Sequence, residues 1–217
     1  MPDFTPTPRS RVKRLNQRAL YDTETVHRLI DEIGTGSVGY VIEGQPYVTP
    51  TLVWREGERL YWHGSSASRM LKTVRGGVPV CVNVFHLDGL VLARSGMHSS
   101  VNYRSVSLFG NAALVEGDAA KEASLKAFLD RFVPGRWDDL RPVNQQELKA
   151  TMVVSMTIEE ASAKVRTGHC ADDEEDYALD IWAGIVPIRT VIGEPESDPR
   201  NKPGLTPPAY LDTVAIG

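Results

Sequence analysis

Short runs of alternating apolar and polar residues fill the first half of the chain, and turn-forming residues separate them. Between positions 47 and 54, Val48, Leu52 and Trp54 share one face, while Thr49 and Thr51 share the other. This alternation predicts a β-strand. Because the connections are short turns, we expect antiparallel strands rather than βαβ units. The same pattern predicts further strands at 37–42, 60–63, 78–86, 90–95, 102–115, 151–166 and 181–192.

Several positions within these strands predict a change of direction. Asp88-Gly89 is a strong signal for a tight hairpin. In the predicted strand at 102–115 the apolar face changes near Ser107, which predicts a bulge. Gly110 in the same strand is a candidate kink. A change of parity within 151–166 predicts another bulge. We expect such bends where strands turn the corner of a barrel.

Helical periodicity predicts three helices besides the strands. The first begins at Asp22 or Thr23, either of which can act as the N-cap, and ends at Gly34. Its apolar stripe consists of Val26, Leu29, Ile30 and Ile33. Another helix begins at Asp118, and its stripe consists of Leu125, Phe128, Leu129 and Phe132. The third follows the strand at 60–63, and a further short helix is expected from Asn144.

The two ends of the chain differ from its centre. Residues 1–20 are rich in Pro and Arg, which predicts an N-terminal arm lying on another surface. Residues 194–217 form a Pro-rich C-terminal tail. The 21–193 segment between them contains all the predicted long elements. Together they predict one mostly β domain, most simply a β-barrel with inserted helices.

The bulk composition argues against several classes of protein. The net charge is −4 and long basic runs are absent, so nucleic acid is not the expected partner. The only two cysteines, Cys81 and Cys170, indicate neither a disulfide framework nor a zinc site. No apolar run approaches the roughly 18–20 residues that a membrane span needs. The first ten residues lack a secretory apolar core. We therefore expect a cytoplasmic protein without a membrane partner.

One stretch, 59–75, has the character of a binding site. An aromatic strand runs into His63-Gly64, then into three serines and Arg69, and then into an apolar helical stripe. Hydroxyls and a cation at a helix start suit a phosphate group. An ordinary capped helix after a strand is an equal alternative. The familiar glycine-rich phosphate loops, zinc motifs and nucleophile elbow are absent. The acidic segment 168–180 is interpreted as a loop and not as a metal site.

Two further segments leave two interpretations open. The strand that starts at Asn102-Tyr103-Arg104 is unusually polar. It is either an edge strand facing solvent or a strand that lines a ligand. Trp182 before Gly184 is either a core aromatic or a wall against a planar ring.

Taken together, four segments resemble the pyridoxamine 5′-phosphate oxidase-like FMN-binding split barrels. The most similar branch is that of flavin-nucleotide-binding proteins that include the nitroimidazole-resistance (Nim) proteins. The segments are 39–50, 60–69, 102–110 and 182–187, in the order of the family. The resemblance implies a six-stranded antiparallel split barrel and a homodimer, with FMN in a groove between the subunits.

The resemblance also implies roles for particular residues. Phosphate binding falls to Ser68 and Arg69, with Ser65 and Ser66 as added donors and His63-Gly64 before them. Contacts to the ring and the ribityl chain fall to Pro50, Thr51, Leu52 and Val53. Contacts near the flavin, expected across the dimer, fall to Asn102, Tyr103, Arg104, Ser105 and Val106. Trp182 matches a tryptophan that the oxidases keep near the flavin. His63 is the catalytic candidate.

This sequence departs from the oxidases at two places. The strand at 51–54 has neither the Arg nor the Lys that they place there. The C-terminal Arg-x-His that reads pyridoxal phosphate is also absent, since Ile188-Arg189-Thr190 lacks the histidine. Oxidation of pyridoxamine phosphate is therefore not the expected reaction.

The leading hypothesis is an FMN-dependent oxidoreductase that acts on a small organic molecule, with a nitro compound as one candidate substrate. Arg104 or Lys72 would place a cation near the flavin ring. The alternative is a haem- or flavin-binding split barrel without redox turnover of its own. In that case His63, His86 or His98 is the candidate axial ligand of a haem.

Overall fold

The computed structural model describes residues 2–214 and 216, and its centre is one antiparallel sheet of ten strands. The sheet order is β3-β2-β6-β7-β8-β5-β4, with β9 on β7, β1 on β9 and β10 on β6. The strands at the two ends of this order, β3 and β4, do not pair with each other, so the barrel is split, as expected. The strands are β1 (Ala19–Leu20), β2 (Thr35–Ile42), β3 (Gln45–Leu52), β4 (Trp54–Glu56), β5 (Arg59–Ser65), β6 (Gly76–Leu92), β7 (Ser100–Leu114), β8 (Thr151–Thr157), β9 (Glu160–Arg166) and β10 (Gly184–Pro187).

Six long strands remain when β8 and β9 are counted as one interrupted strand and the short β1, β4 and β10 are set aside. This agrees with the expected six-stranded barrel. The predicted strand at 151–166 is broken at Ile158-Glu159. Its first half pairs with β5 and its second half with β7, so the change of parity marks a barrel corner.

Gly110 marks the opposite side of the same corner. Before it, β7 pairs with β9, and after it β7 pairs with β8. A Cβ atom at Gly110 would lie 2.2 Å from the carbonyl oxygen of Thr157. Only glycine allows the two backbones to approach so closely. The bulge expected near Ser107 is wrong, because the even-numbered residues 106–112 face inward without interruption.

The helices cover the sheet and confirm most of the sequence pattern. They are α1 (Thr23–Ile33), α2 (Arg69–Val74), α3 (Asp118–Phe132) and α4 (Gln145–Ala150). Asp22 caps α1, since its side chain accepts a hydrogen bond from the Thr25 N–H at 2.8 Å. Gly34 ends α1 in the left-handed region at φ 64°. The predicted stripe of α1 is fully buried in the main core.

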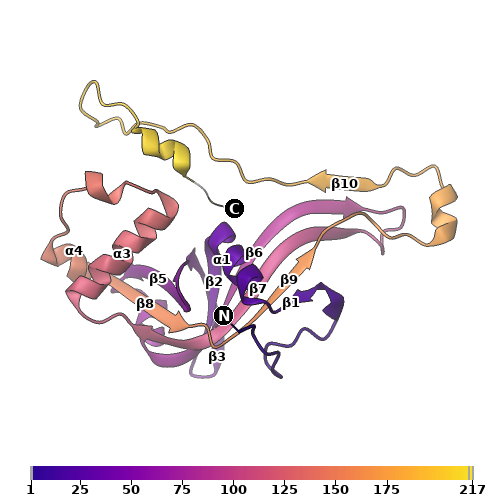
Figure 1. The fold of residues 1–217 in the computed structure, drawn as a ribbon, viewed down its shortest axis with the longest axis horizontal. Helices are drawn as coiled ribbons and strands as arrows, with labels where there is room; N and C mark the ends of the chain where they lie inside the picture. The colour runs from indigo at the N-terminus through magenta and orange to yellow at the C-terminus, as the bar shows by residue number, and fades with distance from the viewer. Residues whose placement is uncertain (1, 215, 217) are drawn as a thin grey trace.

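The expected hairpin at Asp88-Gly89 is wrong. β6 continues through this position to Leu92 with only a register shift, and the chain turns back between β6 and β7. The result is a long β6–β7 hairpin that projects from the barrel, with β10 along its edge (Figure 1). A Cβ at Gly89 would lie 3.0 Å from the carbonyl oxygen of Val186 in β10. The glycine therefore serves a close strand contact and not a turn.

Both ends of the chain pack against the same domain. The N-terminal arm adds β1 to β9 and places Arg9 2.6 Å from Glu160. After β10 the C-terminal tail crosses back over the barrel toward α3 (Figure 1). There the hydroxyl of Tyr210 accepts a hydrogen bond from Arg136 at 3.0 Å. Within the described residues, none of the helices has the length and apolar character needed to cross a membrane.

Candidate functional site

The turn between β5 and α2 carries the expected phosphate-binding serines. Ser68 caps α2, and its Oγ accepts a hydrogen bond from the Leu71 N–H at 3.4 Å. Ser65 Oγ accepts from the Ala67 N–H at 3.2 Å. Because both oxygens act as acceptors within the turn, both O–H groups are left to donate to an oxygen atom of a ligand. The backbone N–H of Ser66 donates to a carbonyl of α4 and is not available.

Arg69 supplies the positive charge of this turn. Its guanidinium carbon lies 4.5 Å from the ring centroid of Tyr47 in β3, within the range of a cation–π contact. Among the described residues, no carboxylate lies within ion-pair distance of Arg69, so its charge is available to an anion. Since α2 has only six residues, its dipole is small, and a phosphate at this turn would be held by these side chains. We call Ser65, Ser68 and Arg69 the cradle.

A groove of about 480 Å³ lies farther along β3 from the cradle. Tyr47, which contacts Arg69, and Thr51, which lines the groove, are four residues apart on an extended strand, so their Cα atoms lie about 13 Å apart. The groove is lined by Thr35, Gly36, Ser37, Pro50, Thr51, Leu52, Asn83 and Phe85. Three of the four predicted ring-contact residues are therefore brought together. Val53 is 1% exposed and belongs to the core instead.

Phe85 and Tyr103 form an aromatic wall beside this groove. Phe85 is 52% exposed, and its ring stacks on Tyr103 of β7 with 6.2 Å between the centroids. Tyr103 is one of the predicted flavin contacts, whereas Phe85 was not predicted. The only sequence signal was that Phe85 shares a strand face with Asn83, which also lines the groove.

The other predicted residues of β7 have partners within their own chain. Asn102 is buried, and its Nδ2 donates to the carbonyl of Gly168 at 3.1 Å. Ser105 Oγ donates to the carbonyl of Lys164 at 3.1 Å. Val106 is fully buried in the core. Their expected contact with a flavin stays a prediction.

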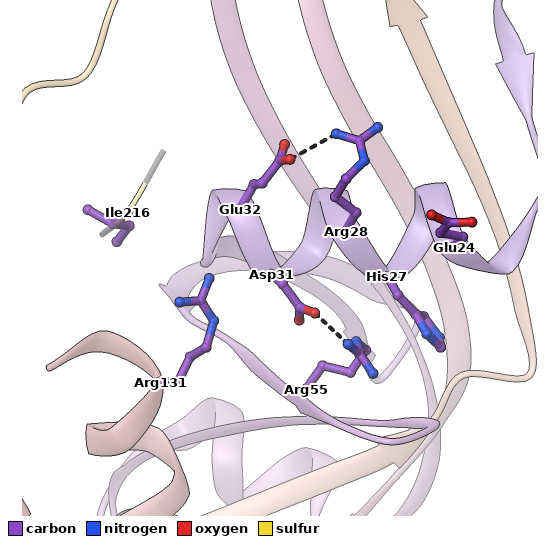
Figure 2. A pocket seen from close by; sticks show the side chains of 8 residues that line it. All are labelled: Glu24, His27, Arg28, Asp31, Glu32, Arg55, Arg131 and Ile216. Atoms are coloured by element: carbon purple, nitrogen blue, oxygen red, sulfur yellow. Dashed lines mark hydrogen bonds and ion pairs between the residues drawn. The ribbon is translucent and has the colours of Figure 1, made fainter. Parts of the chain in front are cut away.

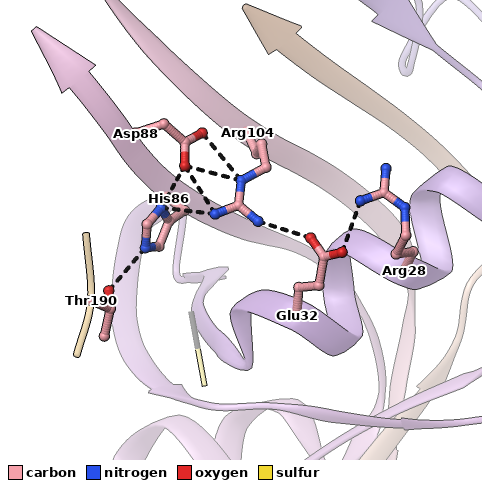
Figure 3. Close-up of polar contacts among 6 residues, drawn as sticks. All are labelled: Arg28, Glu32, His86, Asp88, Arg104 and Thr190. Carbon is pink, nitrogen blue, oxygen red and sulfur yellow. Dashed lines mark hydrogen bonds and ion pairs between the residues drawn. The ribbon is translucent and has the colours of Figure 1, made fainter. Parts of the chain in front are cut away.

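Arg104 is held between two carboxylates (Figure 3). Its guanidinium donates to both oxygens of Asp88 at 2.9–3.1 Å and to Glu32 of α1 at 2.8 Å. Desolvation raises the pKa of Asp88, but hydrogen bonds from Arg104 and His86 outweigh it, so the pKa lies below its usual value. The charge of Arg104 is thus neutralised by the protein, which argues against a free cation at this position beside a flavin ring.

His63 lies on β5 among aromatic rings. The ring centroids of Trp54 and Phe128 are 5.8 and 4.6 Å from that of the imidazole. Its Nδ1 is buried and has no hydrogen-bond partner among the residues that the structure describes. Burial lowers the pKa of His63 below its ordinary value, so the ring is neutral at physiological pH. Gly64 follows, where a Cβ would lie 3.2 Å from Leu71 of α2.

Trp182 is 68% exposed and lies just before β10. A Cβ on Gly184 would lie 2.8 Å from the indole, so the ring packs over that glycine. This exposure excludes an ordinary core aromatic. A role as a wall against a planar ring stays a prediction.

A separate pocket of about 610 Å³ lies between α1, β4 and α3 (Figure 2). Its charged lining comprises Glu24, Arg28, Asp31, Glu32, Arg55 and Arg131. Arg28 pairs with Glu32 at 2.8 Å, and Arg55 pairs with Asp31. Because these charges neutralise one another and no predicted site residue lines the pocket, we assign it no ligand.

Comparison with known proteins places the chain in a family. The sequence profile described as pyridoxamine 5′-phosphate oxidase matches residues 22–165. The chain therefore belongs to the pyridoxamine 5′-phosphate oxidase family, as its sequence resemblance indicated. A search of curated proteins returned no match.

Two solved structures are similar to nearly the whole chain. The flavocytochrome Anf3 from Azotobacter vinelandii is 47% identical, with a TM-score of 0.93 over 99% of this chain and 100% of that one. The FAD and haem binding protein from Mycobacterium smegmatis is 36% identical, with a TM-score of 0.86 over 92% and 98%. A candidate 5-nitroimidazole antibiotic resistance protein from Bacteroides thetaiotaomicron shares the fold at 20% identity, with a TM-score of 0.55 over 68% and 86%.

Proposed function

We propose that this chain binds a flavin nucleotide and a haem and acts as an oxidoreductase of the flavocytochrome type. The observation that carries the proposal is the full-length match to two relatives described as a flavocytochrome and as an FAD and haem binding protein. When bound, a flavin supplies one- and two-electron transfer and a haem supplies one-electron exchange. The part of the protein is to bind both groups and to fix their orientation.

The cradle and the groove support flavin binding. Two hydroxyl donors and an arginine that has no carboxylate partner in the described part of the chain suit the phosphate, and the cation–π contact with Tyr47 holds that arginine beside β3. The groove at Pro50–Leu52, with Phe85 as an aromatic wall, suits a planar ring. We infer from this arrangement that the flavin extends along β3, with its phosphate at the cradle.

The identity of the flavin is the point at which we depart from the sequence prediction of FMN. The Mycobacterium relative is described as binding FAD, and we propose FAD for this chain. The same cradle serves either nucleotide, because both carry a phosphate at the end of the ribityl chain. Reduction of a small organic molecule such as a nitro compound stays a prediction from the family resemblance.

The chain also offers donors that fit a haem. One ring nitrogen each of His27, His63 and His98 is buried and has no hydrogen-bond partner within residues 2–214 and 216. A neutral imidazole is a common axial ligand of haem iron. The proposed function therefore joins the two hypotheses drawn from the sequence. It takes the flavin and the redox turnover from the leading hypothesis and the haem from the alternative.

A homodimer is proposed as well, as the resemblance implies. The apolar residues Val41, Val48 and Phe85 are 59%, 69% and 52% exposed, and β3 is the last strand at one end of the sheet order. Exposed apolar surface of this kind marks association sites, and a second copy of the chain would cover it.

Removal of the cradle cation tests the flavin half of the proposal. A charge-assisted hydrogen bond contributes about 1.5–3 kcal/mol, so Arg69→Ala should weaken flavin binding by about 10- to 150-fold. The matched control is Arg75→Ala, which removes an exposed arginine at the opposite end of α2. Titration of flavin fluorescence measures both affinities. Equal affinities for the two variants would contradict the assignment of the cradle.

A further inference from the structure

A pocket separate from the cradle and the groove lies on the face of the sheet that α3 covers. Its volume is about 300 Å³, and it is enclosed by α3, α4, the loop between them and the start of β8 (Figure 1). Most of its lining is aliphatic and comes from Leu125, Leu140, Val143 and Leu148. Pockets for small molecules are mostly apolar with a few polar groups, and this volume is at the lower end of their range. The pocket therefore suits one planar base and not a whole nucleotide cofactor.

Thr151 connects this pocket to the cradle. It lines the pocket at the start of β8 and pairs directly with Ser65 of β5. Residues that lie opposite each other in antiparallel strands project from the same face, with their Cβ atoms about 4.5–5.5 Å apart. That face is the one that α3 covers, because Val153, two residues farther along β8, belongs to the same core cluster as Phe132 of α3. Ser65 of the cradle therefore lies one strand spacing from a residue of the pocket.

The groove and the pocket are formed by different elements. Strands β2, β3 and β6 form the groove, whereas α3, α4 and β8 form the pocket, and among the described residues none lines both. In FMN the phosphate is the end of the molecule, but in FAD a second phosphate, a ribose and adenine follow it. This extension is longer than one strand spacing of about 4.8 Å. A flavin with its ring at the groove and its first phosphate at the cradle can therefore reach the pocket with its adenine.

Two charged side chains give the pocket the polar groups that a purine needs. Arg141 donates to both carboxylate oxygens of Glu147. These hydrogen bonds, with a further one from the Asn144 N–H, lower the pKa of Glu147 to about 2, so its carboxylate is ionised. A guanidinium plane stacks on aromatic rings, and a carboxylate accepts a hydrogen bond from an exocyclic amine. Adenine has both a ring face and such an amine.

We propose that this pocket binds the adenine ring of FAD and thereby makes the chain select FAD over FMN. The inference rests on the proposed function, since it takes the flavin phosphate to lie at the cradle. The aliphatic lining removes the base from water, and the pair of Arg141 and Glu147 orients it. FMN gains nothing from the pocket because it has no adenine.

The test measures the affinities of the full-length chain for FAD and for FMN by titration of flavin fluorescence, after bound flavin has been removed. The parent chain should bind FAD at least tenfold more tightly than FMN. Val143→Trp introduces an indole from a half-buried position of the lining and should bring the two affinities within twofold of each other, with FMN binding unchanged. The matched control is Val191→Trp, which adds the same ring at an exposed valine of the C-terminal tail and should keep the ratio of the parent chain.

A smaller change keeps the test decisive where the indole disturbs folding. Leu140 is 39% exposed, so Leu140→Ser removes part of the aliphatic lining without opening the core, and it should weaken FAD binding two- to tenfold while FMN binding stays the same. An unchanged ratio of affinities in both pocket variants, or a parent chain that binds FMN as tightly as FAD, would overturn the inference while flavin binding at the cradle stands. Failure of the parent chain to bind either flavin would instead refute the proposed function.

Discussion

Gly110 is the position at which the fold is most sensitive to a single added methyl group. A Cβ there would lie 2.2 Å from the carbonyl oxygen of Thr157, while ordinary Cβ contacts begin near 3.4 Å. Because that oxygen belongs to the backbone, no side-chain rotation relieves the overlap. β7 and the end of β8 would have to separate by about 1 Å at the corner where β7 exchanges β9 for β8.

The cost of Gly110→Ala follows from this overlap. Overpacking costs about 1–3 kcal/mol and occasionally more, and the entropic gain of Gly→Ala offsets about 0.4–1 kcal/mol of it. Since the clash is with backbone, we take the upper end of the overpacking cost, about 3 kcal/mol, and expect a net loss of about 2–2.6 kcal/mol, equivalent to roughly 4–10 °C in Tm for a domain of this size.

The assay is thermal or urea unfolding of Gly110→Ala beside Gly76→Ala. Gly76 lies in β6, where no atom of the described residues stands within 4 Å of an added Cβ, so its variant should stay within about 0.5 kcal/mol of the parent. Equal stabilities of the two variants would refute the close crossing of β7 and β8. They would also remove the physical reason for a barrel corner at this glycine.

Two further predictions concern the ion-pair network and the oligomeric state. Arg104→Met leaves Asp88 and Glu32 without their shared partner and should cost about 1–3 kcal/mol in urea unfolding, less than for a fully buried pair because Arg104 is partly exposed. Because the folded-state pKa of Asp88 is lowered, the stabilisation from this ion pair is present above about pH 4 and is lost as the pH falls through that pKa. If the free energy of unfolding of Arg104→Met falls with acid as steeply as that of the parent chain, the ion pair does not contribute this pH dependence. Light scattering should give twice the 23.9 kDa chain mass, and Val48→Asp should shift the protein toward monomer. A parent chain of monomer mass would refute the proposed dimer.

Elements defined by neighbouring residues could be predicted from the sequence. The cap, the apolar stripe and the glycine stop of α1 all lie within about twelve positions, and the structure confirms each of them. The capping box of α4 at Asn144 and Glu147 is equally local. Such elements need no knowledge of the rest of the chain.

The hairpin signal at Asp88-Gly89 failed because the partners of both residues are distant in the sequence. Asp88 is held by Arg104, and the backbone of β10 passes over Gly89. A turn signal and a tertiary contact use the same two residue types at this position. Local pattern alone does not distinguish them.

The candidate site likewise has a part that local sequence predicts and a part that only the fold assembles. The cradle lies within one stretch of sequence, and its serines and arginine were predicted from that stretch. The groove is assembled from three strands, so Phe85 could not be recognised before β3 and β6 were placed together. The contact of Arg69 with Tyr47 likewise joins a residue of α2 to a residue of β3.

The central claim is that this chain carries both a flavin and a haem, and cofactor content measures it most directly. The full chain is purified from cells supplied with a haem precursor and then denatured, released flavin is identified by mass spectrometry, and haem is quantified as its pyridine complex. The account predicts FAD and haem in equal amounts, with a Soret band and flavin absorbance in the native spectrum. Protein that retains only one of the two groups or neither, and does not take up the missing group when it is added, would contradict it.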